Sequence, residues 1–188
     1  MTIYLIRHGQ DDEAVRGGWS QSSLSPEGIR QAQELANKVY ALRKTMKISR
    51  VFASDLPRAL ETAQPIANLL QLEEELLPEF REMNNGSLAG MPNEEADRDY
   101  PSFHWSQMDW DEPYPQGESP HEFYERIKKA WRDFIRLNSQ KNVILVSHAG
   151  VMRIIFALVR EEDFTNKSKR MDFPCAQIFT LELGENDA

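Results

Sequence analysis

Short apolar runs with strand preference recur along the chain and predict the strands of a buried sheet. The clearest runs lie at residues 3–6, 51–53 and 142–146. Runs this short suit strands that are buried on both faces of a parallel sheet, although a buried helix segment would give the same pattern. Two further strands are predicted at residues 72–77 and 177–183, where polar side chains interrupt the pattern and suit the edges of a sheet.

Between these runs, apolar residues recur at helical spacing and predict amphipathic helices. The segments lie at about residues 26–44, 54–70, 119–138 and 151–159. Ser25-Pro26-Glu27 is a strong helix start, with a hydroxyl cap, a proline and an acid in the first turn. Ser119 and Glu122 have the spacing of a capping box. Pro65 falls inside the second segment and predicts a kink or a division there.

Two of these helices present apolar residues that we expect to face the core. In the first helix they are Ile29, Ala32, Ala36, Val39 and Tyr40. In the second they are Ala59, Ala63, Ile66, Ala67 and Leu70. Each set recurs at the three- and four-residue spacing that aligns side chains along one side of a helix.

The order of strands and helices predicts the fold class. Strands alternate with helices, which is typical of a three-layer α/β/α sandwich with a mostly parallel central sheet and helices on both faces. Residues 78–118 are rich in proline, glycine, acidic and aromatic residues and predict an excursion over the active-site edge of the sheet, with a short helix near Asn93–Asp99. We expect residues 1–188 to form a single domain, since the chain contains no repeat, low-complexity tract or linker.

Composition narrows the possible partners and compartment. The formal net charge of −8 argues against general affinity for nucleic acid or an anionic membrane, but a local cationic pocket could still bind a small anion. The single cysteine, Cys175, excludes an intrachain disulfide and a thiolate metal cluster. Met1 leads directly into the first strand without the pattern of a signal peptide, and no apolar stretch is long enough to cross a bilayer. We expect a cytoplasmic protein.

Candidate chemistry lies where two predicted strands end. Arg7-His8-Gly9 follows the first strand, and Ser147-His148 follows the strand at residues 142–146. Parallel strands end at the same edge of a sheet, so the two histidines can converge there, where ligands of open α/β sheets bind. Arg58 falls in the first turn of a helix, whose free N–H groups suit an anion. Two arginines and two imidazoles around one helix terminus favour a phosphate as occupant.

On these residues the sequence resembles the histidine phosphatase superfamily, also called phosphoglycerate mutase-like. The matching segments occur in the family's order, between about residues 3 and 155. They are Leu5-Ile6-Arg7-His8-Gly9 and residues 18–28, 54–63, 80–86, 117–119 and 146–150. Arg-His-Gly alone would be weak evidence, whereas all of these segments in order are strong evidence.

The resemblance implies a set of site residues. His8 would be the nucleophile that forms a phosphohistidine, while Arg7, Arg58 and His148 would hold the non-bridging oxygens and stabilise the transition state. Glu82 would protonate the leaving oxygen and then deprotonate the attacking water. Residues beside the two histidines, Gln10 and Ala149, are expected to contribute to substrate binding. No metal and no cofactor are expected, because guanidinium groups can take the part of a metal ion.

Structural roles are the alternative for each residue taken singly. His148 could fill a strand end, Arg58 could pair with Asp55 or Glu61, and Glu82 could be one more acid in an acidic chain. His104 and His121 are expected to have surface or packing roles, and the four histidines lack the close spacing of zinc ligands. Four aromatic residues of the excursion could roof the substrate pocket, but a small satellite core is the favoured reading. They are Phe103, Trp105, Trp110 and Tyr114.

The loop after Gly9 departs from the family pattern. The family commonly has a threonine two residues after this glycine and an asparagine a little further on, whereas this chain has Asp11, Asp12 and Glu13 and neither of those residues before Arg16. Acids near the pocket should weaken the binding of highly charged substrates unless they point outward. One hypothesis is that Asp11 or Asp12 recognises a cationic part of the substrate.

The favoured function is a metal-independent phosphatase that hydrolyses a small phosphomonoester through a phosphohistidine on His8. The alternatives are a phosphoglycerate mutase-type phosphoryl transferase and a catalytically weak phosphate-binding regulatory module. The expected partner is a small phosphorylated metabolite, without nucleic acid or membrane. The sequence leaves the identity of the phosphomonoester and the oligomeric state open.

Overall fold

A central sheet with helices on both faces forms the body of the computed structural model, which describes residues 1–168 and 171–184. In these ranges the sheet has five strands in the order β3-β2-β4-β1-β5. They are β1 (Thr2–Arg7), β2 (Arg50–Ala53), β3 (Glu74–Leu76), β4 (Asn142–Ser147) and β5 (Ile178–Glu182). The first four run parallel and β5 pairs antiparallel with β1, so the predicted edge positions of β3 and β5 are confirmed.

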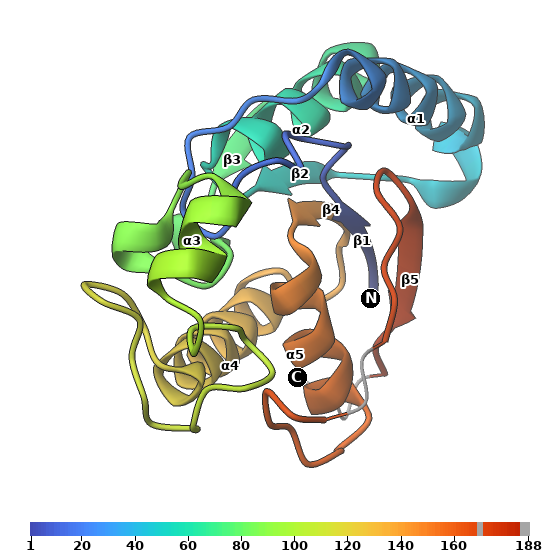
Figure 1. The fold of residues 1–188 in the computed structure, drawn as a ribbon. Helices are drawn as coiled ribbons and strands as arrows, with labels where there is room; N and C mark the ends of the chain where they lie inside the picture. Colours follow the sequence, from blue (N-terminus) through green and yellow to red (C-terminus); the bar gives the residue numbers. More distant parts are fainter. Residues whose placement is uncertain (169–170, 185–188) are drawn as a thin grey trace.

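Helices cover both faces of the sheet (Figure 1). They are α1 (Pro26–Met46), α2 (Pro57–Leu70), α3 (Asn93–Asp99), α4 (Pro120–Leu137) and α5 (Ala149–Val159). Helices α1 and α2 lie on one face and α4 and α5 on the other. Alternate residues of β1 point to opposite faces: Ile6 packs in the cluster with α1 and α2, whereas Ile3 and Leu5 pack in the cluster with α4 and α5. The predicted three-layer α/β fold is therefore confirmed. None of the helices in the described ranges is both long and apolar enough to cross a membrane.

Helix α1 begins as predicted, but its buried face is narrower than predicted. The side-chain oxygen of Ser25 accepts a hydrogen bond from the backbone N–H of Gly28, at 3.1 Å. The prediction that Ile29 and Tyr40 face the core was wrong, because their exposed fractions are 59% and 40%. The buried positions are Gly28, Ala32, Leu35, Ala36, Val39 and Met46. Ile29 follows the buried Gly28, and one residue corresponds to a rotation of about 100° around the helix axis, so its side chain points outward.

Helix α2 runs unbroken from Pro57 to Leu70, so the predicted division at Pro65 does not occur. Leu70 is only partly buried, while the other predicted apolar residues of α2 face the core. Alanines on this face let α1 and α2 lie close together. Pro57 occupies the first helical position, where its missing N–H costs nothing. Arg58 therefore lies in the first turn, as predicted.

Residues 78–118 connect β3 to α4 and contain the predicted short helix, α3, together with two 3-10 turns at Pro78–Phe80 and Gly86–Leu88. The capping box at the start of α4 is confirmed: the Ser119 hydroxyl accepts from the Glu122 N–H, and the Glu122 carboxylate accepts from the Ser119 N–H. In the parallel pairing of β1 with β4, Arg7 lies opposite Ser147. This register places the residues that follow, His8 and His148, side by side.

Candidate active site

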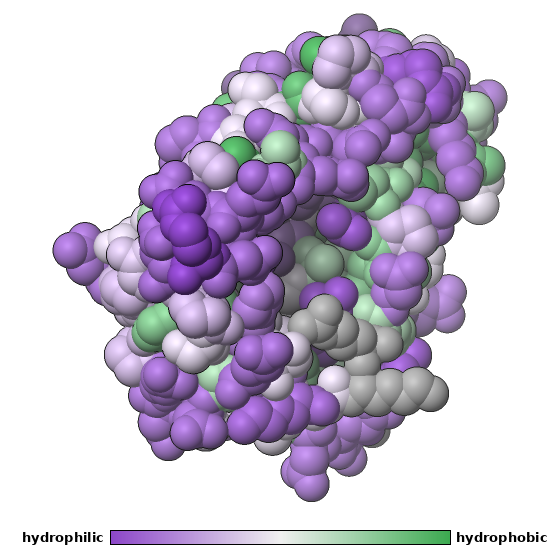
Figure 2. Space-filling view, viewed as in Figure 1, coloured by the Kyte–Doolittle hydropathy of each residue, from purple (hydrophilic) through white to green (hydrophobic). Residues whose placement is uncertain are grey.

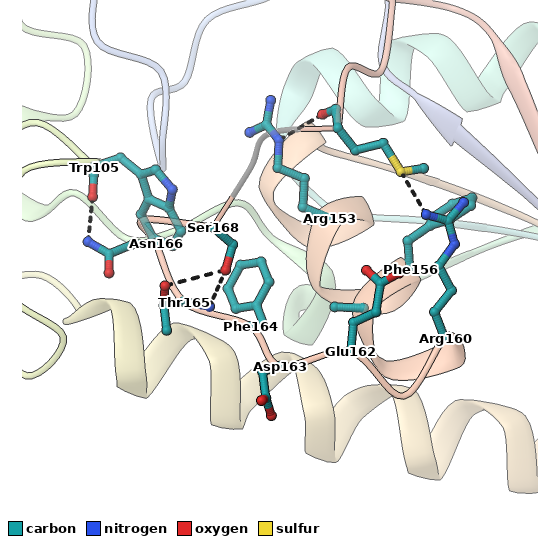
Figure 3. A pocket seen from close by; sticks show the side chains of 12 residues that line it. Trp105, Arg153, Phe156, Arg160, Glu162, Asp163, Phe164, Thr165, Asn166 and Ser168 are labelled. Atoms are coloured by element: carbon teal, nitrogen blue, oxygen red, sulfur yellow. Dashed lines mark hydrogen bonds between the residues drawn. The ribbon is translucent and has the colours of Figure 1, made fainter.

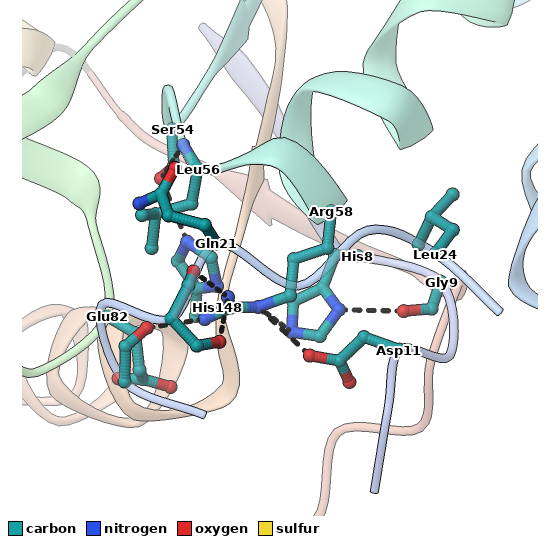
Figure 4. A network of polar contacts seen from close by, with 12 residues as sticks. His8, Gly9, Asp11, Gln21, Leu24, Ser54, Leu56, Arg58, Glu82 and His148 are labelled. Carbon is teal, nitrogen blue, oxygen red and sulfur yellow. Dashed lines mark hydrogen bonds and ion pairs between the residues drawn. The ribbon is translucent and has the colours of Figure 1, made fainter. Parts of the chain in front are cut away.

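His8 and His148 meet at the carboxyl edge of the sheet, as their positions after parallel strands predicted. Their ring centroids lie 5.1 Å apart, and both side chains are buried. The backbone N–H of His8 donates to the carbonyl of Ser147 at 3.0 Å, which extends the ladder between β1 and β4 beyond the strands themselves. Figure 4 shows the two rings with Arg58 and Asp11 beside His8. The sheet thus fixes both imidazoles relative to one another.

The hydrogen bonds of His8, to Gly9 at Nδ1 and from Arg58 Nε at Nε2, fix which ring nitrogen carries the proton. Its Nδ1 lies 2.7 Å from the carbonyl oxygen of Gly9, which can only accept, so Nδ1 carries the proton and Nε2 carries the lone pair. Gly9 is held in turn by Thr62 of α2, whose hydroxyl accepts from the Gly9 N–H at 2.9 Å. Burial, reinforced by the Arg58 cation, lowers the pKa of His8 to about 3. The imidazole is therefore neutral at physiological pH.

Burial also lowers the pKa of His148, and the cation of Arg58 adds to the effect. Its Nε2 lies 2.9 Å from the hydroxyl of Ser54, the residue that follows β2. Its Nδ1 is buried and has no hydrogen-bond partner among the described residues. His148 is thus a neutral ring anchored at one nitrogen, and Ala149 follows it as the first residue of α5, where backbone N–H groups have no partner within the helix.

Arg58 ties the nucleophile to the loop at residues 17–20. Only 2% of its side chain is exposed. One terminal nitrogen donates to the carbonyl of Gly18 at 2.7 Å, and the other lies 3.3 Å from the carbonyl of Ser20. Its Nε lies 3.3 Å from Nε2 of His8. Burial lowers the pKa of this guanidinium, but an arginine stays cationic in proteins. A fixed positive charge therefore lies beside the nucleophilic nitrogen.

Arg58 pairs with Asp11, and not with Asp55 or Glu61 as the structural alternative supposed. Oδ2 of Asp11 lies 3.3 Å from Nε of Arg58, and the Asp11 side chain is 16% exposed. Asp55 instead binds Arg81, and Glu61 accepts the backbone N–H of Leu24. Burial raises the pKa of Asp11, outweighing the opposing effect of Arg58. Of the three acids in this loop, Asp11 thus points inward, while Asp12 and Glu13 are exposed.

Glu82 lies across the site from Asp11 (Figure 4), held by backbone groups. Its Oε2 accepts the N–H of Gly150, in the first turn of α5, at 3.0 Å, and its Oε1 accepts the N–H of Met83 at 3.1 Å. The carbonyl of Glu82 accepts from Trp19 Nε1 at 2.7 Å and from Arg126 at 3.1 Å. The carboxyl group is thus positioned by α5 and its backbone by α4.

The remaining predicted site residues lie at the margins of this cluster. One terminal nitrogen of Arg7 donates to the carbonyl of Phe173 at 2.8 Å, while its Nε is buried with no hydrogen-bond partner among the described residues. Gln10 is bound through its backbone to α1: its N–H donates to the Gln31 side chain at 3.0 Å, and its carbonyl accepts from Ser25 at 2.8 Å. Arg7 thus borders the two histidines, whereas Gln10 fixes the start of the loop.

A pocket of about 240 Å³ opens beside Glu82, and Figure 2 shows a hollow near the middle of this face, rimmed mainly by hydrophilic side chains. Its lining includes Arg16, Gly18, Glu82, Tyr114 and Gly150. Trp105 and Arg153 line both this pocket and a neighbouring one of about 400 Å³ (Figure 3). The two pockets together offer room for a leaving group next to the proposed acid.

The aromatic residues of the excursion divide between the two predicted roles. Trp105 and Tyr114 line the pocket beside Glu82. Trp110 instead stacks on His121, with ring centroids 5.5 Å apart, in a cluster away from it. His121 is exposed and binds Asp111, and His104 is partly buried and binds Asp97, so the predicted surface or packing roles are confirmed.

Sequence reasoning missed two residues that support the site. Arg126 of α4 donates to the carbonyls of Glu79, Arg81 and Glu82 and forms an ion pair with Glu118. Ser54 binds His148. The only available signal was position, because Ser54 follows a strand at the edge of the sheet where the two histidines meet.

In residues 1–168 and 171–184, no three His, Cys, Asp or Glu side chains cluster so that they could hold a metal ion.

Comparison with known proteins shows which family the chain belongs to. The model of the histidine phosphatase superfamily (branch 1) matches residues 3–187. Phosphoglycerate mutase-like protein 4 of Arabidopsis thaliana is 32% identical over 84% of this chain and 70% of its own length. The metal-independent phosphoserine phosphatase of the same plant is 31% identical over 88% and 71%.

Solved structures show the same fold. The alpha-ribazole phosphatase from Shigella flexneri superimposes with a TM-score of 0.82 at 24% identity, over 98% of this chain and 92% of that one. The family model spans the Arg7-His8-Gly9 turn, Arg58, Glu82 and His148, which the structure brings together. The chain belongs to the histidine phosphatase superfamily, branch 1.

Proposed function

We propose that this protein hydrolyses a small phosphomonoester through a phosphohistidine on His8, without a metal ion. The observation that carries the proposal is the state of the His8 ring: Nδ1–H is held by the carbonyl of Gly9, and the unprotonated Nε2 lies 3.3 Å from Nε of Arg58. A neutral imidazole with its lone pair beside a fixed guanidinium is suited to attack a phosphorus atom.

In the first step, Nε2 of His8 forms a bond to phosphorus while the bond from phosphorus to the ester oxygen breaks. Glu82 in its acid form gives its proton to that oxygen, so the leaving group departs as an alcohol. Arg7, Arg58 and His148 surround the non-bridging oxygens and stabilise their negative charge in the transition state. The two guanidinium groups supply the positive charge that a metal ion provides in other phosphoryl transfer enzymes.

In the second step, water attacks the phosphohistidine. The Glu82 carboxylate takes a proton from the water as its oxygen bonds to phosphorus, and the bond between Nε2 and phosphorus breaks. Inorganic phosphate leaves, and both His8 and Glu82 return to their starting forms. The N–H of Gly150 keeps Glu82 at the edge of the pocket that would hold the leaving group.

The substrate we propose is a small phosphorylated metabolite, because the pocket beside Glu82 has a volume of about 240 Å³ and Arg16 and Arg153 among its lining residues. Neither nucleic acid nor a membrane is part of the proposal. We also propose a cytoplasmic location, which is supported by the single cysteine, since structural disulfides are typical of oxidising compartments.

A phosphoglycerate mutase-type transfer is the second candidate, because one relative is named a phosphoglycerate mutase-like protein. In that case the phosphoryl group on His8 would return to a second hydroxyl of the substrate instead of passing to water. The two activities share the first step and differ only in what accepts the phosphoryl group.

The test is phosphate release from a panel of phosphomonoesters that includes phosphoserine, 3-phosphoglycerate and alpha-ribazole phosphate, with a chelator present. The wild type should release phosphate from at least one of them, and His8→Ala should release none. Isomerised phosphoglycerate without free phosphate would favour the mutase. Equal activity in the wild type and His8→Ala would overturn the proposal.

A further inference from the structure

Asp11 forms an ion pair with Arg58, the arginine proposed to bind the phosphoryl group of the substrate. Its Oδ2 and Nε2 of His8 are both 3.3 Å from a single atom, Nε of Arg58 (Figure 4). The carboxylate is largely buried and Arg58 almost completely so. A negative charge of the protein itself therefore lies beside the nucleophilic nitrogen.

Both terminal nitrogens of Arg58 bind the loop at residues 17–20. One terminal nitrogen binds the carbonyl of Gly18, and the other binds the carbonyl and hydroxyl of Ser20. The Nε–H of Arg58 faces His8 and donates to its Nε2 at 3.3 Å, while Oδ2 of Asp11 lies at the same distance from Nε as an ion-pair partner. For phosphorus to approach Nε2 of His8, a phosphoryl oxygen must come within reach of that same N–H. The oxygen would then lie close to the Asp11 carboxylate, and the two negative groups would compete for the Arg58 cation.

We infer that Asp11 is a specificity-determining residue that competes, as an internal anion, with the substrate's phosphoryl group for Arg58. This inference rests on the proposed function. Phosphate binds only when the Asp11 carboxylate turns away from Arg58 or takes up a proton. Asp11 therefore weakens the binding of inorganic phosphate, the reaction product, and of any doubly charged phosphate.

The backbone around Asp11 is fixed, so the side chain is the part that moves. The N–H and carbonyl of Gln10 are both bound to the α1 region, and Asp11 itself forms a bridge with Leu24. Asp12, the next residue, is exposed, and its carboxylate accepts the N–H of Ala14 at 2.9 Å. Asp11 contacts Arg58, whereas the carboxylate of Asp12 binds Ala14, so Asp12 can serve as a control for the charge of Asp11.

The groups around Asp11 favour relief of the competition as the pH falls. Arg58 and Arg7 stabilise the carboxylate, whereas burial, which is the largest effect, and the nearby Glu13 raise the pKa of Asp11. The remaining neighbour is the half-buried thiol of Cys175, whose pKa is itself raised by burial. His8 stays neutral until the pH approaches its own pKa of about 3. Protonation of Asp11 therefore removes the competing charge without protonating the nucleophile.

The test is the affinity of the full-length protein for inorganic phosphate, measured by isothermal calorimetry at pH 7.5 and pH 5. Asp11→Asn keeps the shape and removes the charge, and Asp11→Ala separates loss of charge from gain of an amide donor. Asp12→Asn is the matched control, with the same change in net charge. Melting temperatures without phosphate show whether each variant is folded.

At pH 7.5 both Asp11 variants should bind phosphate about tenfold more tightly than the wild type, or better. Asp12→Asn should match the wild type, and the advantage of Asp11→Asn should shrink at pH 5. If folded Asp11 variants bind no more tightly than the wild type, the inference is overturned while the proposed function stands. If neither the wild type nor any variant binds phosphate, and no phosphomonoester of the panel releases phosphate, both the inference and the proposed function are overturned.

Discussion

The backbone N–H of Gly150 donates a 3.0 Å hydrogen bond to Oε2 of Glu82. This contact joins two segments that are 68 residues apart in the chain. Gly150 lies in the first turn of α5, two residues after His148. A single strand-to-helix turn therefore carries the ring that we propose to bind the phosphoryl group and also positions the proposed acid.

Substitution of Gly150 by alanine should displace the acid. A Cβ at this position would overlap Oε1 of Glu82, while alanine otherwise suits a helix. We expect kcat to fall roughly a hundredfold with the fold intact, because small displacements of reacting groups are costly. Steady-state kinetics and a melting curve measure both effects.

Gly17→Ala is the control for this change, since a Cβ on Gly17, which also lines the pocket, would meet nothing within 4 Å. Its kcat should stay close to that of the wild type. A Gly150→Ala enzyme with unchanged kcat would show that the position of Glu82 seen here does not matter for turnover.

Arg126 is expected to act as a positioning residue for Glu82. It donates to three backbone carbonyls of the segment at residues 79–82 and forms an ion pair with Glu118. Arg126→Met should lower kcat about tenfold to a hundredfold and change KM little, because the phosphate-binding groups lie elsewhere. Arg132→Met, an exposed site on the same helix, carries the same charge change. Equal kcat losses in the two variants would contradict a positioning role.

The strands and the histidines could be predicted because short apolar runs and parallel ends are local signals. The runs that became β1 and β4 were clear, and their common direction brought His8 next to His148. Arg58 followed from the helix start at Pro57. The positions of these residues could therefore be predicted without knowing which distant parts of the chain are in contact.

Features that depend on tertiary contacts could not be predicted. The pairing of Asp11 with Arg58 depends on which of several acids turns inward, and spacing in the sequence does not encode that choice. Nothing in the sequence distinguishes Arg126 from the other cationic residues, because its role depends on the packing of α4 beside the segment that carries Glu82. Ile29 was misplaced because the buried face of α1 is narrower than its apolar pattern.

The buried histidine predicts a loss of stability in acid. The pKa of His8 is lowered to about 3, against 6.5 for a free histidine, so the unfolded chain binds a proton between these values that the native state does not. This difference in proton binding leaves the native state at full stability above pH 6.5 and destabilises it progressively as the pH falls towards 3. At pH 5 the unfolding free energy should be lower by about 2 kcal/mol.

Urea unfolding of the wild type and His8→Asn at pH 7.5 and pH 5 measures this effect. Between pH 7.5 and pH 5, the unfolding free energy of His8→Asn should fall by about 2 kcal/mol less than that of the wild type, because asparagine cannot take up the proton. An unchanged pH dependence would mean that His8 is protonated in the native state, contrary to the tautomer assigned from its bond to Gly9.

The central claim is that His8 carries the phosphoryl group, and trapping that intermediate tests it most directly. With p-nitrophenyl phosphate, whose leaving group needs no proton, Glu82→Gln should form the phosphoenzyme normally and hydrolyse it slowly. Rapid quenching and mass spectrometry should find one phosphoryl group on His8, labile in acid and stable in alkali, and none in the His8→Asn variant. No phosphoenzyme in Glu82→Gln, or a phosphoryl group on another residue, would contradict the account.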